Sequence, residues 1–187
     1  MTPSSIRYVI DTRASQFTVQ AFASGLISVI AHSPKLAIRD WAGEASAADD
    51  DLRDLSLNVH LKTDSLEVLD EIRDSDKREL RRVMNEEVLE TARFPEVVFK
   101  STDSQATKLG DALYRVNVRG RLTLHGVSNE HSFAAQVSLG ADTARAYGEF
   151  SVSQTQYDMH IASIAGGNLK LRDELKLTYY VVARKQP

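Results

Sequence analysis

The chain has 187 residues, of which 42% are hydrophobic and 26% charged, and these values predict one soluble globular domain spanning residues 1–187. A net charge of -3 provides no basic surface for nucleic acid, and the absence of cysteine excludes disulfides, thiolate metal sites and a cysteine nucleophile. No apolar stretch is long enough to cross a bilayer, so we expect a protein that does not span a membrane. Residues 1–8 lack the basic start and apolar run of a secretory signal, which predicts a cytoplasmic location.

Alternation of apolar and polar residues is the dominant pattern along the chain and predicts β-strands. Early in the chain, Phe17 and Val19 alternate with Gln16 and Thr18, which places the apolar residues on one face of a strand. Only four prolines are present, and none falls inside a predicted strand. The pattern predicts about nine or ten strands, and the clearest cover residues 6–11, 16–21, 35–43, 55–62, 96–101, 113–124, 133–139, 146–153 and 175–183.

Residues 76–93 are the exception to this alternation. Asp76 with Glu79 resembles a capping box, and Phe94-Pro95 ends the segment because a residue before proline avoids the helical conformation. We therefore expect one capping helix over residues 76–93 and a shorter, weaker helix over residues 65–73. In the longer segment, apolar residues fall close to helical spacing at Leu80, Val83, Met84 and Val88.

So many antiparallel strands must close or stack to hide their edges. We therefore expect a mainly β fold, either a closed barrel or a sandwich. In both, the apolar face of each strand turns inward, and the same residues either fill a solid core or line an open lumen. Thirteen inward-facing residues are the candidate ligand-binding positions: Phe17, Val19, Ile38, Leu57, Val59, Phe99, Val116, Val118, Leu122, Phe133, Val137, Leu177 and Tyr179.

The five histidines raise the question of metal binding or acid–base chemistry. Their spacing gives neither His-x-His nor His-Glu-x-x-His, so we expect no metal site. A small enzyme that uses His32 or His160 as acid or base is an alternative, although no nucleophile elbow accompanies either residue. The glycines match neither a phosphate-binding loop nor a dinucleotide fingerprint, so we expect no cofactor. His125-Gly126 predicts the end of a strand and a tight turn.

Three groups of landmarks follow one another along nearly the whole chain, from about Tyr8 to Ala183. The first comprises Tyr8-Val9-Ile10-Asp11, Ala31-His32-Ser33-Pro34 and Trp41-Ala42-Gly43; the second is Arg93-Phe94-Pro95-Glu96-Val97-Val98-Phe99-Lys100-Ser101; the third comprises Gly120-Arg121-Leu122-Thr123-Leu124-His125-Gly126-Val127 and Gly166-Gly167-Asn168-Leu169-Lys170-Leu171-Arg172-Asp173-Glu174. Together they resemble the YceI-like family of lipocalin-like polyisoprenoid-binding proteins. The resemblance implies a closed antiparallel barrel of about eight strands, capped by a helix at one end, with a long apolar lumen.

One segment departs from the family's pattern. Where the family commonly has Thr-Asp-aromatic-Gly-Ile, this chain has Thr155-Gln156-Tyr157-Asp158-Met159. Aspartate in place of glycine predicts a different turn or bulge at this rim.

The resemblance also implies a function. We expect non-enzymatic binding, carriage or sequestration of a long-chain apolar lipid, of polyisoprenoid or fatty-acyl type, inside the barrel. The alternatives are the small histidine enzyme described above and an interaction module with a filled core. A homodimer is expected only because two-fold dimers are the commonest soluble assembly.

Overall fold

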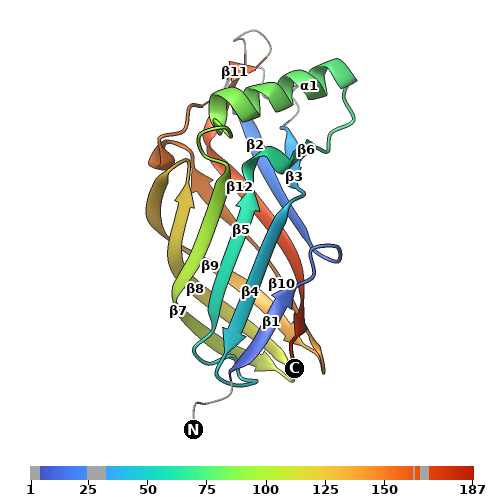
Figure 1. Cartoon of the computed structure of the whole chain (residues 1–187), viewed down its shortest axis with the longest axis vertical. Helices are drawn as coiled ribbons and strands as arrows, with labels where there is room; N and C mark the ends of the chain where they lie inside the picture. Colours follow the sequence, from blue (N-terminus) through green and yellow to red (C-terminus); the bar gives the residue numbers. More distant parts are fainter. Residues whose placement is uncertain (1–4, 25–32, 162, 165–168) are drawn as a thin grey trace.

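The computed structural model describes residues 5–24, 33–161, 163–164 and 169–187. Within these residues, twelve β-segments form one sheet that closes on itself (Figure 1). No helix in this part of the chain is long and apolar enough to cross a membrane. The segments are β1 (Ile6–Ile10), β2 (Gln16–Ser24), β3 (Lys35–Ile38), β4 (Trp41–Ala47), β5 (Ser56–Lys62), β6 (Leu66–Val68), β7 (Glu96–Gly110), β8 (Leu113–Leu124), β9 (Val127–Leu139), β10 (Thr143–Ser153), β11 (Ser163–Ile164) and β12 (Leu169–Lys185), with a 3₁₀ turn η1 (Thr63–Ser65), helix α1 (Asp74–Val83), a π-helical turn η2 (Met84–Val88) and a second 3₁₀ turn η3 (Thr155–Tyr157).

The sheet closes because β12 pairs with β10 along one edge and with β1 along the other. The closed circuit runs β1–β4–β5–β7–β8–β9–β10–β12, and every pairing in it is antiparallel. The predicted closed barrel of about eight strands is confirmed, and closure leaves these strands without free edges. In Figure 1, α1 lies across one end of the barrel and the C-terminus lies near the other.

Three of the eight barrel positions are each occupied by two segments. β12 pairs with both β1 and β2. β1 then pairs with β4, which pairs with β5. In the same way β2 pairs with β3, which pairs with β6. The single strand predicted over residues 35–43 is interrupted at residues 39–40, where the Arg39 N–H donates to the Ser65 carbonyl oxygen (3.2 Å). Among the described segments, β6 pairs with β3 alone, and β7 pairs with β5 and β8. Among the described segments, β6 therefore has no strand partner on its other side, at the end of the barrel where α1 lies (Figure 1).

The capping helix covers residues 74–88, as α1 and η2, instead of the predicted 76–93. Asp76 lies inside the first turn, so the capping box predicted there is wrong. The helix ends early because Glu90 adopts a left-handed conformation with φ of 45°. In η2 the Leu89 N–H donates to the Met84 carbonyl oxygen, five residues back (2.9 Å). This π-helical spacing turns both side chains toward the inside of the barrel.

The weaker helix predicted over residues 65–73 is also wrong, because this stretch contains β6. Leu66 and Val68 are buried and Glu67 is exposed, which is the alternation of a strand. β6 pairs with β3, a partner that is distant in sequence, and Glu67 forms an ion pair with Arg39 on the outer surface. Pairing with a distant strand decides the conformation here.

A two-residue turn joins β8 to β9, as predicted at His125-Gly126. Both residues have positive φ, 51° and 75°, which is typical of the type I′ turn that matches the strand twist. A Cβ atom on Gly126 would lie 2.6 Å from the Phe94 ring, so Phe94 packs directly on the glycine. The buried His125 ring hydrogen-bonds through Nδ1 with the Tyr157 carbonyl oxygen (3.2 Å) and through Nε2 with the Glu90 carboxylate (2.9 Å). His125 therefore ties the segment after the helix to the β8–β9 turn and to η3.

The rim segment around η3 contains a left-handed residue at the position where the chain departs from the family pattern. Asp158 has φ of 53°, and aspartate tolerates this left-handed conformation better than most residues. Gln154 is 1% exposed, and its Nε2 donates to the Arg172 carbonyl oxygen (2.9 Å) beside a register shift in β12. The neighbouring Asp173 carboxylate accepts hydrogen bonds from the Ser153 hydroxyl (2.5 Å) and the Thr155 N–H (2.8 Å).

Asp173→Asn is expected to lower the free energy of unfolding by about 1 kcal/mol at pH 7. The hydrogen bonds from Ser153 and Thr155 hold the pKa of Asp173 below its ordinary value. A lowered folded-state pKa gives stability that is present above the unfolded pKa of about 3.9 and is lost as the pH falls through the folded value. The difference between variant and parent in urea unfolding should therefore shrink from pH 7 to pH 3. A difference that stays constant over this range would contradict the assignment, and Glu174→Gln, at an exposed neighbour, is the control.

Candidate functional site

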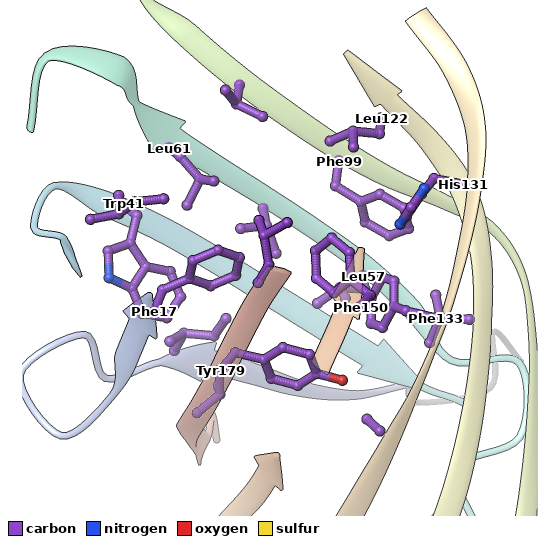
Figure 2. A pocket seen from close by; sticks show the side chains of 18 of the residues that line it. Phe17, Trp41, Leu57, Leu61, Phe99, Leu122, His131, Phe133, Phe150 and Tyr179 are labelled. Carbon is purple, nitrogen blue, oxygen red and sulfur yellow. The ribbon is translucent and has the colours of Figure 1, made fainter. Parts of the chain in front are cut away.

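A cavity of about 240 Å³ lies inside the barrel (Figure 2). Its wall includes side chains from every strand of the closed circuit and is predominantly apolar. A volume slightly below the usual range of small-molecule pockets favours a slim ligand over a bulky one. All thirteen sequence-predicted positions lie on this wall: Phe17, Val19, Ile38, Leu57, Val59, Phe99, Val116, Val118, Leu122, Phe133, Val137, Leu177 and Tyr179.

Strand β8 shows how the sequence builds the wall. Every second side chain from Tyr114 to Leu124 is buried, and nearly all those between them are exposed. Val116 and Val118 are 1% and 3% exposed and face the cavity, whereas Arg115 faces solvent. The period of two therefore places one face of each strand inside the barrel.

Aromatic rings form a connected cluster within the cavity wall (Figure 2). The Phe133 ring lies 5.3 Å from Phe150, 5.2 Å from Phe99 and 5.9 Å from Tyr179, measured between ring centroids. The Phe17 ring extends the cluster toward Trp41, at 6.1 Å. These separations are those of favourable offset or edge-to-face pairs, so the rings hold one another in place around the cavity.

Small residues on the inner face make room for these rings. Gly120 on β8 and Gly148 on β10 both occupy inward positions. A Cβ atom on Gly120 would lie 2.6 Å from Phe99 Cζ, and one on Gly148 would lie 2.7 Å from the Ala134 carbonyl oxygen, with the Tyr179 hydroxyl closer still. Only glycine allows rings and backbone to approach this closely, and alanines at several other wall positions also keep the interior open.

Apolar side chains also contribute to the wall from outside the barrel strands. Met84 and Leu89 reach the cavity from the helical segment at one end. Leu52 reaches it from the β4–β5 connection; it is 2% exposed and has φ of 59°. A left-handed conformation is unfavourable for leucine, and here it goes together with burial of the side chain in the barrel.

Tyr179 and His131 are among the polar side chains that line this predominantly apolar cavity. The Tyr179 hydroxyl donates to the Ala134 carbonyl oxygen (3.0 Å), and burial raises the pKa of Tyr179. His131 lines the cavity from β9, and burial lowers the pKa of its imidazole. Sequence reasoning missed His131, although counting back two residues from Phe133 along β9 places it on the inner face.

Of the two histidines proposed as acid or base, His160 lies in the described part of the chain. His160 is exposed and does not line the cavity. His32 lies outside the described residues. The described part of the chain contains no group of three or more His, Asp or Glu side chains arranged to hold a metal ion.

Metal independence remains a prediction from the histidine spacing. Chelation with EDTA is expected to leave the melting temperature unchanged, because only a metal bound to the folded state would raise it. Thermal unfolding before and after chelation, with metal analysis of the dialysed protein, checks this. A stoichiometric metal whose removal lowers the melting temperature would overturn it.

A closed eight-stranded antiparallel barrel around an apolar cavity, with a helix across one end, defines a lipocalin-like protein. The model of the YceI-like domain matches residues 8–183, and the chain belongs to the YceI-like family. The predicted family is thereby confirmed. A search of curated proteins gave no significant match.

Solved structures share this fold at low sequence identity. BcnA from Burkholderia cenocepacia has a TM-score of 0.71 and 14% identity, over 92% of this chain and 98% of that one. A polyisoprenoid binding domain from Saccharophagus degradans, described as implicated in plant cell wall breakdown, has a TM-score of 0.67 and 12% identity, over 96% and 98% of the two chains. The YceI protein of Campylobacter jejuni has a TM-score of 0.60 and 13% identity, over 81% and 85%. At these identities the likeness shows the fold alone.

Proposed function

We propose that this protein binds a long-chain apolar lipid, of polyisoprenoid or fatty-acyl type, in the barrel cavity and carries or sequesters it without catalysis. The observation that carries the proposal is the apolar cavity enclosed by strands of the whole barrel. The Saccharophagus degradans domain, which has the same fold, is described as polyisoprenoid binding, and this supports the class of ligand.

Apolar burial supplies the binding energy in this proposal. Each buried methylene contributes about 0.8 kcal/mol, which corresponds to about a fourfold gain in affinity. Affinity should therefore rise along a series of linear lipids and level off once the lumen is full. An interaction module with a filled core would show no such dependence. For the enzyme alternative, His160 lies away from the cavity, and His32 lies outside the described residues.

Organic extraction of the purified protein followed by mass spectrometry is the first test. We expect a near-stoichiometric lipid, or, after delipidation, uptake of long-chain probes with the length dependence given above. Protein that releases no lipid and takes up no chain of any length would contradict the proposal. The same preparations, examined by light scattering, test the homodimer, which is still a prediction from the frequency of two-fold assemblies.

Ala146→Trp tests whether the lumen is the binding site. Ala146 lies on the cavity wall in β10, so a tryptophan there is expected to fill the lumen and lower the affinity for a long-chain probe at least tenfold. The free energy of unfolding should change by less than about 3 kcal/mol, the usual limit for an added core side chain. Arg145→Trp is the matched control, because the adjacent Arg145 is exposed. Equal affinities for the two variants would place the ligand elsewhere.

A further inference from the structure

His131 places a nitrogen among the apolar side chains of the cavity wall. It lies on the inner face of β9, directly across from Gly120 on β8, and Figure 2 shows its ring among the cavity-lining side chains. The ring centroid is 5.1 Å from that of Phe150. The Nε2 atom is buried and has no hydrogen-bond partner in the part of the chain that the structure describes.

Such an atom requires an explanation, because buried polar atoms in folded proteins are almost always hydrogen-bonded. An apolar side chain at this position would have completed the wall without leaving a nitrogen unpaired. Gly120, opposite His131, carries no side chain, and the Phe99 ring packs into the space beside it. His131 itself lines the cavity. A ligand in the cavity would therefore meet this nitrogen.

We propose that His131 hydrogen-bonds an uncharged oxygen of the bound lipid, a hydroxyl, carbonyl or ether, and holds it inside the barrel. This inference rests on the proposed function and narrows the ligand class. A neutral imidazole donates or accepts one hydrogen bond, whereas a carboxylate or phosphate in this apolar surrounding would be costly to bury. His131 lies four residues along β9 from Val127, about 14 Å from the β8–β9 turn at 3.4 Å per residue. The oxygen would lie at that depth, with the longer apolar part extending toward Val137.

The test compares 1-tetradecanol with tetradecane, which differ by one hydroxyl oxygen. Binding to delipidated protein is followed by the fluorescence of Trp41, the single tryptophan, which lines the cavity. The measured quantity is the ratio of the affinities for alcohol and alkane. His131→Phe removes the nitrogen and keeps a ring, and it is expected to lower this ratio about tenfold, because the hydroxyl then enters the lumen without a partner. His131→Gln restores a donor and acceptor and should recover most of the ratio.

His60→Phe is the matched control, since His60 lies on β5 between the inward-facing Val59 and Leu61 and does not line the cavity. Its ratio should equal that of the parent. His131→Leu, which is smaller than phenylalanine, separates loss of the nitrogen from crowding and should lower the ratio as His131→Phe does. A ratio that stays within twofold of the parent in both apolar variants, while the alkane still binds, would overturn the role of His131 and leave the proposed function standing. A parent protein that binds neither probe, and takes up no longer chain either, would overturn both.

Discussion

Val59→Glu is expected to abolish binding of a long-chain lipid and to lower the free energy of unfolding by about 3–4 kcal/mol at pH 7. Val59 lies on the cavity wall in β5 and pairs with Phe99 of β7. A carboxyl group there is surrounded by apolar side chains, which raise its folded-state pKa above the unfolded value of about 4.3. The penalty is therefore small below pH 4 and grows by about 1.4 kcal/mol per pH unit as the pH rises toward the folded pKa.

Urea unfolding between pH 4 and pH 7, with lipid binding measured on the folded variant at each pH, checks this expectation. Ser56→Glu is the control, because Ser56 is exposed on the same strand. Asn58, which alternation predicts to face solvent, is a poorer control because its Oδ1 atom is buried without a partner among the described residues. Unimpaired lipid binding by folded Val59→Glu, or greater damage from Ser56→Glu, would show that the face assigned to β5 is wrong.

Gly120→Val is expected to destabilise the barrel by about 3 kcal/mol or more, at the upper end of the usual cost of an overpacked core. A Cβ atom at this position would lie 2.7 Å from Ser101 Cα and 2.6 Å from Phe99 Cζ, with the Lys100 carbonyl oxygen closer still. Two of these three neighbours are backbone atoms of the paired strand β7, so relief requires β7 and β8 to separate. Urea unfolding of variant and parent, followed by circular dichroism, measures the loss.

Gly110→Ala is the matched control for this prediction. Gly110 lies near the other end of β7, and a Cβ atom there would meet nothing within 4 Å. Replacing glycine where the backbone permits alanine stabilises a protein by about 0.4–1 kcal/mol. If both glycine variants have the same stability as the parent, the close approach at Gly120 is not a constraint on this fold.

The alternation of side chains was sufficient to predict which faces of the strands turn inward. β8 covers Leu113–Leu124, which are the predicted bounds, and it pairs with β7 and β9 along its length. Residues 35–43 and 65–73 were predicted less well. In both stretches the conformation depends on hydrogen bonds to segments distant in sequence, such as that between Arg39 and Ser65, and no local pattern encodes these.

The alternation of apolar and polar residues does not predict whether the barrel contains a cavity. The same alternation describes a filled core and an open lumen, and the difference depends on how much volume the inward side chains occupy. Gly120 and Gly148 make room because they have no side chain, so a search of the sequence for apolar side chains does not find them. His131 was passed over for a related reason, since a polar residue interrupts the apolar pattern of β9 while still facing inward.

In the part of the chain that the structure describes, the missing second partner of β6 makes the strands of this barrel unequal in how firmly they are paired. β12 pairs with β2, β2 pairs with β3, and β3 pairs with β6. Among the described segments, β6 does not pair with β7. β6 pairs with β3 over three residues, whereas β8 pairs with both β7 and β9 over nearly its whole length. Amide hydrogens of β3 and β6 should therefore exchange faster than those of β8, which is paired on both sides along its length.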